Sequence, residues 1–307
     1  MASLRIVLTV IVGLALLVSD PIAAPDYSDW NTPLNLGSVV NSAFTDAGPA
    51  ISKDGLSLFF GSDRPGGSGG LDLWVSQRAS LEDPWGPPIN LGAAINSADL
   101  ENVPALSRDA HWLFFNSSRS GGFGANDIWA SYRQHTKDDF GWQAPVNLGS
   151  GVNSSSQDQG ATYFENEEGG TALLFFNSDR PGGIGITDIY VSQLLADGSF
   201  GAASLVSELS STAVDQRPAI RFDGLEVVFF SNRPGSLGNV DLWASTRQTV
   251  FDAWSTPTNL GPVVNTTASD QNPYMAPDRR VLYFASTRAG GFGAADLYVT
   301  TRARRAP

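Results

Sequence analysis

One module of about 55 residues recurs five times along the chain, and this repeat restricts the fold more than any other feature. Each copy opens on W-x-x-P-x-N-L-G, which begins at Trp30, Trp85, Trp142 and Trp254, with a degenerate copy near Phe200. An acidic residue, a turn of the type S-x-D-G and an apolar run follow in each copy. The chain therefore builds one structural unit several times.

Polar positions recur with the same period. Each apolar run ends in S-x-R, and an aspartate eight residues later opens the pattern D-[LI]-[WY]. The arginines are Arg64, Arg119, Arg180, Arg233 and Arg288, and the aspartates are Asp72, Asp127, Asp188, Asp241 and Asp296. The acidic residues earlier in each copy are Asp46, Glu101, Asp158, Asp215 and Asp270.

The unit consists of strands. Short apolar runs are bounded by clusters of Gly, Pro, Asn and Asp, and no helical stripe occurs after the N-terminal segment. The second strand of each copy is apolar on both faces, as in Leu58-Phe59-Phe60 and Leu113-Phe114-Phe115, so each sheet is buried on both sides. Four-stranded antiparallel sheets stacked around an axis provide this burial. The sequence predicts an all-β, five-bladed β-propeller.

The phase of the repeat predicts how the ring closes. The chain enters on the W-x-x-P-x-N-L-G strand and ends on a D-L-Y strand at residues 296–300, so the last copy lacks its own outer strand. We expect residues 31–37 to supply it. Closure of this kind pairs strand edges that would otherwise promote aggregation.

The N-terminus has the layout of a secretory signal peptide. Arg5 precedes an apolar run of thirteen residues, Ile6 to Val18, and small residues follow at Ala23 and Ala24. The run is shorter than the roughly 20 residues of a membrane-spanning helix, which disfavours a permanent anchor. We expect residues 1–24 to be removed, after Ala23 or Ala24, and residues 25–307 to form one domain in the periplasm or outside the cell.

Charge and cysteine content restrict the partners and the chemistry. The net charge of −12 disfavours nucleic acid and anionic membranes as partners. The chain contains no cysteine, which excludes a disulfide framework and a lipid-modified cysteine. We expect a monomer without membrane insertion.

The repeats resemble the WD-repeat-like propeller repeats of TolB-type periplasmic proteins, which are also found fused to OmpA-like domains. The matching segments are S-K-D-G-L-S-L-F-F-G-S-D-R-P-G-G at residues 52–67, its counterparts at 107–122 and 171–183, and the D-L-W-V-S ends. The resemblance implies a propeller fold and an envelope location. It departs from TolB, which has six blades and an extra N-terminal domain.

The acidic residues and the arginines are the candidate ligand-binding residues, because both sets belong to loops on one face of a propeller. This upper face is the one on which the innermost strands begin. Within each blade the acidic residue and the arginine are expected to pair, and the D-[LI]-[WY] aspartates to cap turns. Alternatively, unpaired carboxylates gather a polyhydroxy ligand or, more weakly, calcium. No other cofactor is expected.

Asymmetric positions add further candidates. Phe123 and Phe292 occupy loops where other copies have Ser68, Ile184 and Leu237, so their rings can stack on a ligand or anchor the loop. In the third copy Glu165–Gly170 replaces the short turn and is expected as a solvated loop on the opposite, lower face.

No catalytic set is evident in the sequence. His111 and His135 are both expected on the lower face, away from the carboxylates, which leaves no histidine to serve a serine nucleophile or a metal. The sequence favours a non-enzymatic module that binds a protein or glycan of the cell envelope. The alternative is a glycoside hydrolase with axial carboxylates, although five carboxylates in nearly identical settings lack the contrast that acid and base roles require.

Overall fold

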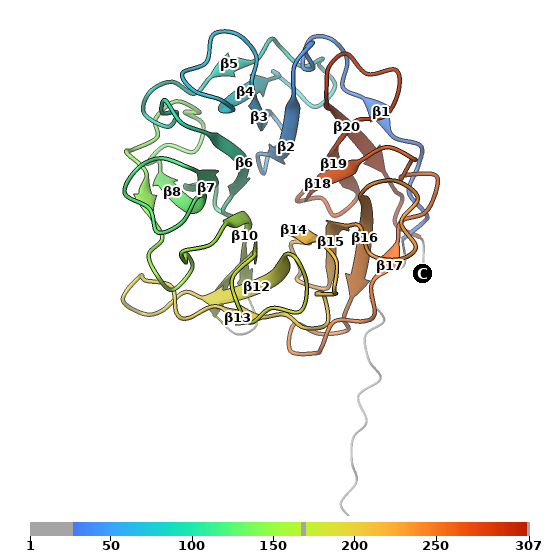
Figure 1. Ribbon diagram of the computed structural model, residues 1–307. Helices are drawn as coiled ribbons and strands as arrows, with labels where there is room; N and C mark the ends of the chain where they lie inside the picture. Colours follow the sequence, from blue (N-terminus) through green and yellow to red (C-terminus); the bar gives the residue numbers. More distant parts are fainter. Residues whose placement is uncertain (1–26, 167–169, 306–307) are drawn as a thin grey trace, which may run out of the picture.

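The structure, a computed structural model, describes residues 27–166 and 170–305. They form five four-stranded antiparallel sheets around a central axis, which is the predicted five-bladed β-propeller (Figure 1). The expected signal peptide, residues 1–24, lies outside the described residues. The described part contains no helix with the length and hydropathy that crossing a membrane requires.

Each blade runs from an innermost strand at the axis to a short outermost strand at the rim. Blade one contains β2 (Asp46–Ile51), β3 (Ser57–Ser62), β4 (Asp72–Gln77) and β5 (Ile89–Asn90); blade two contains β6 (Glu101–Leu106), β7 (Trp112–Ser117), β8 (Asp127–Tyr132) and β9 (Val146–Asn147). Blade three contains β10 (Asp158–Asn166), β11 (Thr171–Ser178), β12 (Asp188–Gln193) and β13 (Ser204–Leu205). Blade four contains β14 (Asp215–Ile220), β15 (Glu226–Ser231), β16 (Asp241–Thr246) and β17 (Thr258–Asn259).

Blade five is closed by the N-terminal strand, as the phase of the repeat predicts. It consists of β18 (Asp270–Met275), β19 (Val281–Ser286), β20 (Asp296–Thr301) and β1 (Leu34–Asn35), with Leu34 opposite Val299. Asn41 reinforces this closure, because its side chain accepts from the backbone N–H of Leu297 and donates to the Leu297 carbonyl. The first and last strands of the described residues are thus joined in one sheet.

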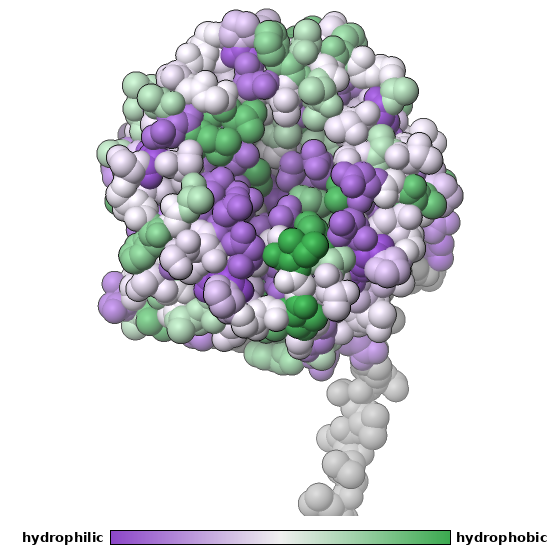
Figure 2. Space-filling view, in the orientation of Figure 1, coloured by the Kyte–Doolittle hydropathy of each residue, from purple (hydrophilic) through white to green (hydrophobic). Residues whose placement is uncertain are grey.

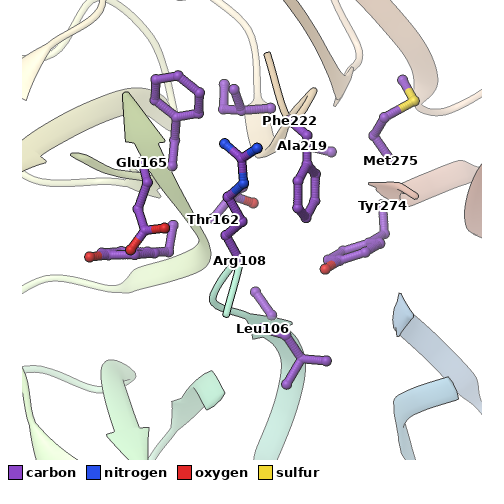
Figure 3. Close-up of a pocket in the computed structure, with 12 residues that line it drawn as sticks. Leu106, Arg108, Thr162, Glu165, Ala219, Phe222, Tyr274 and Met275 are labelled. Carbon is purple, nitrogen blue, oxygen red and sulfur yellow. The ribbon is translucent and has the colours of Figure 1, made fainter. Parts of the chain in front are cut away.

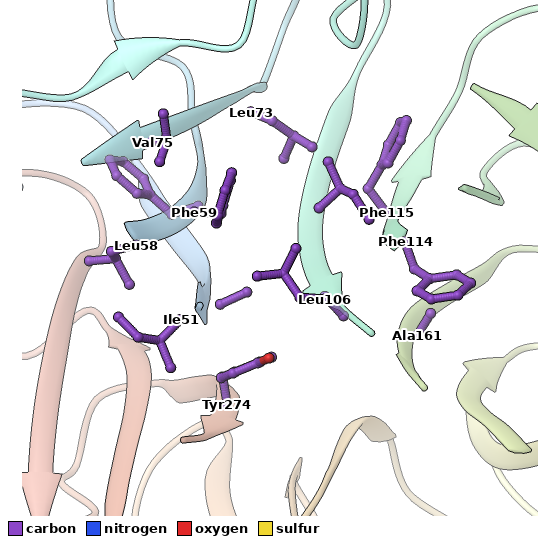
Figure 4. Close-up of a cluster of buried hydrophobic side chains, with 14 of the residues drawn as sticks. Ile51, Leu58, Phe59, Leu73, Val75, Leu106, Phe114, Phe115, Ala161 and Tyr274 are labelled. Atoms are coloured by element: carbon purple, nitrogen blue, oxygen red, sulfur yellow. The ribbon is translucent and has the colours of Figure 1, made fainter. Parts of the chain in front are cut away.

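The hydrophobic core lies between the blades. Phe59 and Leu73 of blade one and Leu106 and Phe115 of blade two belong to one buried cluster that spans the seam (Figure 4). The second strand of each blade contributes side chains to both of its faces, which explains why its sequence is apolar at consecutive positions. The stacking of blades therefore supplies the burial that one sheet alone lacks.

Blade three differs from the other blades in its first two strands and in its outermost strand. Its first two strands are longer, because β10 and β11 extend toward the insertion, so Glu165 lies in a strand rather than in the expected loop. Residues 167–169 of the insertion lie outside the described residues. In the outermost strand Leu205 replaces the asparagine that bonds the D-[LI]-[WY] aspartate elsewhere, as Asn90 does to Asp72, which accounts for the degenerate copy.

Candidate functional site

The five acidic residues pair with the five arginines, one pair in each blade, as predicted. Each carboxylate is the first residue of an innermost strand, and its side chain is 0% exposed. The separations are 2.5 Å for Asp46–Arg64, 3.0 Å for Glu101–Arg119, and 2.5 Å for both Asp158–Arg180 and Asp270–Arg288; Asp215 pairs with Arg233 in the same way. These are buried, charge-assisted contacts.

Each pair belongs to a larger hydrogen-bond set that leaves little capacity for a ligand. In blade four, Asp215 also accepts from the backbone N–H and the hydroxyl of Ser211, at 2.6 and 2.7 Å. Arg233 donates to the Leu209 carbonyl and the Ser231 hydroxyl, and its guanidinium lies 4.8 Å from the ring centre of Phe229. The other blades repeat these contacts, with Ser42, Ser97, Ser154 and Thr266 in the place of Ser211.

These contacts identify the carboxylates as parts of the framework. Acid and base catalysis requires two carboxyl groups that reach a substrate and differ in environment, whereas these five are buried and alike. Across the described residues, no group of three or more His, Asp or Glu side chains is arranged to hold a metal ion.

The D-[LI]-[WY] aspartates cap the Gly-rich loops, also as predicted. Asp72 accepts from the backbone N–H groups of Ser68 and Gly69, and Asp127 from those of Phe123 and Gly124. A side chain at Gly69 would meet the carbonyl oxygen of Asp99 at 1.8 Å, because this loop packs against the loop that enters the next blade. The recurring glycines therefore serve contact between blades.

Phe123 and Phe292 project from these capped loops and are 52% and 49% exposed. They lie on the upper face in blades two and five, which are separated by blade one, so they do not form one aromatic platform. His111, in the β6–β7 turn, and His135, after β8, lie on the lower face as expected. The Nδ1 atom of His111 is 2.8 Å from the carbonyl oxygen of Arg133.

Amide side chains, which the sequence reasoning missed, follow the acidic residues at the upper ends of the innermost strands, where the central channel opens. The residue after each acidic residue is half-buried at the start of an innermost strand, and in four blades it is an amide: Asn102, Gln159, Gln216 and Gln271, with Ala47 in blade one. We call these four residues the mouth amides. Hydrophilic residues also gather around the hollow near the axis on the face shown in Figure 2. The recurring acid–amide dipeptide was the sequence signal for them.

Arg217 obstructs the channel below the mouth amides. It is 1% exposed and donates to the carbonyl oxygens of Pro104, Val103 and Ala161 at 2.7, 3.1 and 3.4 Å, so it links β14 to β6 and β10. Burial lowers its pKa to about 10. Its φ of 53° lies in the left-handed region, which the glycine at the same position of β2 and β10 adopts without strain. Its positive charge therefore lies buried inside the channel, below the upper mouth.

The lower end of the channel is narrow. Arg108, Glu165, Phe222 and Tyr274 surround a cavity of about 20 Å³, enough for one water molecule (Figure 3). Tyr163 lines the same cavity. Burial, and to a lesser extent the nearby charge of Glu165, raises its pKa to about 12.

Comparisons with solved structures show the propeller fold at low identity. An α-L-arabinofuranosidase from Lactobacillus brevis matches with a TM-score of 0.60 and 12% identity, over 88% of this chain and 94% of that one. The catalytic domain of a GH62 α-L-arabinofuranosidase from Coprinopsis cinerea matches with a TM-score of 0.56 and 13% identity, over 91% and 98%. An endo-arabinase from Bacteroides thetaiotaomicron matches with a TM-score of 0.58 and 15% identity, over 89% and 97%.

The resemblance to TolB is supported only as far as the propeller. A TolB-type protein from Agrobacterium tumefaciens matches with a TM-score of 0.47 and 16% identity, over 86% of this chain and 81% of that one, which is too weak to argue from. No protein-family model and no curated protein matches the sequence. The fold is thus that of a five-bladed propeller similar to glycoside hydrolases of families GH43 and GH62.

Proposed function

We propose that this protein is an exported module that binds a glycan at the upper mouth of its channel without cleaving it. The observation that carries this proposal is the contrast between the fully buried, paired carboxylates and the half-buried mouth amides. An amide both donates and accepts hydrogen bonds, which suits the hydroxyl groups of a sugar. Among the described residues, the side chain of Gln271 has no hydrogen-bond partner and is available to a ligand.

The character of the mouth supports a neutral or polar ligand. The buried Arg217, whose guanidinium bonds three carbonyl oxygens, favours a partial negative charge above it only through its electrostatic potential. The prominence of glycosidases among the structural neighbours supports a glycan over a protein partner. Export to the periplasm or the exterior would place the protein where envelope and extracellular glycans occur.

A glycan array on the mature protein, followed by calorimetry with the best ligand, tests the proposal. Replacing Gln216 and Gln271 with alanine should weaken binding by about tenfold or more, because two hydrogen-bonding groups are lost. Phe251→Ala is the control, since this exposed side chain lies in the β16–β17 connection on the lower face. Equal affinity of the amide variant and the parent protein would refute glycan binding at the mouth.

The second candidate is a glycoside hydrolase, which the structural neighbours favour. The paired carboxylates are poor catalysts, but Asp63 and Asp179 are exposed on the upper face and follow β3 and β11. Each accepts a backbone N–H at 2.7 Å, from Thr45 and Gln157 respectively. Turnover of arabinofuranosides that disappears on Asp63→Asn or Asp179→Asn would establish the hydrolase and overturn the binding proposal.

A further inference from the structure

A second set of arginines lies on the lower face, at the ends of the third strands of the blades. Each guanidinium stacks on the tryptophan that opens the outer-strand motif. The distances to the ring centres are 4.4 Å for Arg78–Trp85, 4.3 Å for Arg133–Trp142, 4.2 Å for Arg247–Trp254 and 4.3 Å for Arg302–Trp30. Blade three has Leu194 instead. The cation–π contact is thus a shared structural feature.

The four arginines differ in their anionic partners. Arg133 pairs with Asp139 at 2.6 Å, and Arg302 pairs with Glu226 through both of its terminal nitrogens. Arg247 donates only to the Gly224 carbonyl, at 2.7 Å, and its Nη2 atom is buried without a hydrogen-bond partner. Burial lowers the pKa of Arg247 to about 10. This guanidinium is therefore stacked and held in place without a carboxylate in direct salt-bridge contact.

Arg247 lies in a groove of about 660 Å³, which we call the arginine groove. Its other charged lining residues are Arg221, Glu226, Asp252 and Arg302, and its polar ones are Tyr27, Ser28, Thr246, Gln248 and Ser255. Volumes of this size are typical of small-ligand sites. Glu226 already engages Arg221 and Arg302, so Arg247 is the guanidinium with capacity for a ligand.

The surroundings of the groove are basic although the protein is acidic overall. Arg302 donates its backbone N–H to the carbonyl of Arg280 and its Nη2 to the carbonyl of Arg279. The backbones of Tyr27 and Arg304 are paired in an antiparallel β-bridge. Arg279 and Arg280 pair with Asp223 and Asp278, so the local excess of positive charge comes from the groove lining itself, where three arginines face two carboxylates in a chain of net charge −12. An anion is therefore attracted to this groove from solution.

We propose that the arginine groove binds a carboxylate-bearing sugar, with the Arg247 guanidinium donating to the carboxylate. One guanidinium with capacity matches one monoanionic group, and the nearby Glu226 and Asp252 disfavour a doubly charged phosphate. The exposed Thr246, Gln248 and Ser255 side chains can bond sugar hydroxyls. The choice of a sugar rests on the proposed glycan binding, whereas the anion site does not.

Calorimetry with trigalacturonate, neutral galactotriose and triaspartate as probes tests this inference on the mature protein. Trigalacturonate should bind, and Arg247→Gln should weaken its binding by about tenfold, as expected when a charge-assisted hydrogen bond is lost. The matched control is Arg78→Gln, which loses the same stacking on Trp85 and should change the affinity by less than about twofold.

Two further variants separate a lost site from a damaged fold. Arg247→Lys keeps the charge but not the planar fork, and should bind with intermediate affinity. Asp252→Asn removes a carboxylate from the groove and should tighten binding, a result that unfolding cannot produce. No binding of trigalacturonate, equal affinity of the Arg247→Gln variant, or equally tight binding of triaspartate would overturn the inference.

The outcome also distinguishes this site from the channel mouth. If the Gln216→Ala/Gln271→Ala variant loses trigalacturonate while Arg247→Gln retains it, the inference is wrong and the proposed function stands. If Arg247→Gln loses trigalacturonate while the mouth variant affects no glycan, the arginine groove is supported and the proposed function is wrong.

Discussion

Removal of the Asp215 carboxylate tests whether the acidic residues are structural. Asp215→Ala leaves the N–H and hydroxyl of Ser211 and the Arg233 guanidinium without their acceptor. Breaking a buried ion pair from one side costs about 3–5 kcal/mol. The loss of unfolding free energy should lie near the lower end of this range, at about 3 kcal/mol, because Arg233 keeps its hydrogen bonds to the Leu209 carbonyl and the Ser231 hydroxyl.

A double-mutant cycle measures the pair itself. Arg233→Met should also cost about 3 kcal/mol, since Asp215 keeps only the Ser211 donors. The double variant should cost about 4 kcal/mol, which gives a coupling of about 2 kcal/mol between the two residues. Urea unfolding at unchanged m-value provides the free energies. The control is Asp83→Ala, which removes an exposed carboxylate and should change the unfolding free energy by less than about 0.5 kcal/mol. A loss below about 1 kcal/mol for Asp215→Ala, or strict additivity, would refute the structural role.

Two further predictions concern the ring as a whole, and a third concerns export. Deleting residues 27–37 removes β1 and exposes the edge of β20, so the protein should self-associate in sedimentation experiments; a monomer of unchanged stability would contradict the closure. Arg217→Ala leaves three carbonyls without their donor and opens a void, so the unfolding free energy should fall by about 3 kcal/mol or more, and an unchanged value would show that Arg217 does not brace the blades. The exported protein should begin at Ala24 or Pro25, and mass spectrometry that finds residues 1–24 on the mature product would refute the signal peptide.

The fold and the ion pairs were predictable because their partners lie within one module. Asp46 and Arg64 are 18 residues apart, and the four equivalent pairs recur at similar separations, so the repeat itself shows which residues meet. The closing strand was predictable for the same reason, since the phase of the repeat shows which strand the last blade lacks.

Contacts between modules could not be predicted in this way. Arg217 reaches carbonyls 113 and 114 residues earlier in the chain, and no local pattern indicates that the side chain crosses the ring. The lack of a carboxylate in contact with Arg247 was equally hidden, because its distinction from Arg133 depends on whether a carboxylate such as Asp139 lies near it in space. Positions that depart from the repeat are the most informative about ligand sites, and their roles depend on the three-dimensional arrangement.

Native mass spectrometry of the protein with its best array ligand tests the central claim most directly, because it reports binding and cleavage together. After prolonged incubation, we expect a complex whose mass equals that of the protein plus one intact glycan, and a weaker signal for the Gln216→Ala/Gln271→Ala variant. Bound or released fragments of the glycan would instead show hydrolysis and contradict the account.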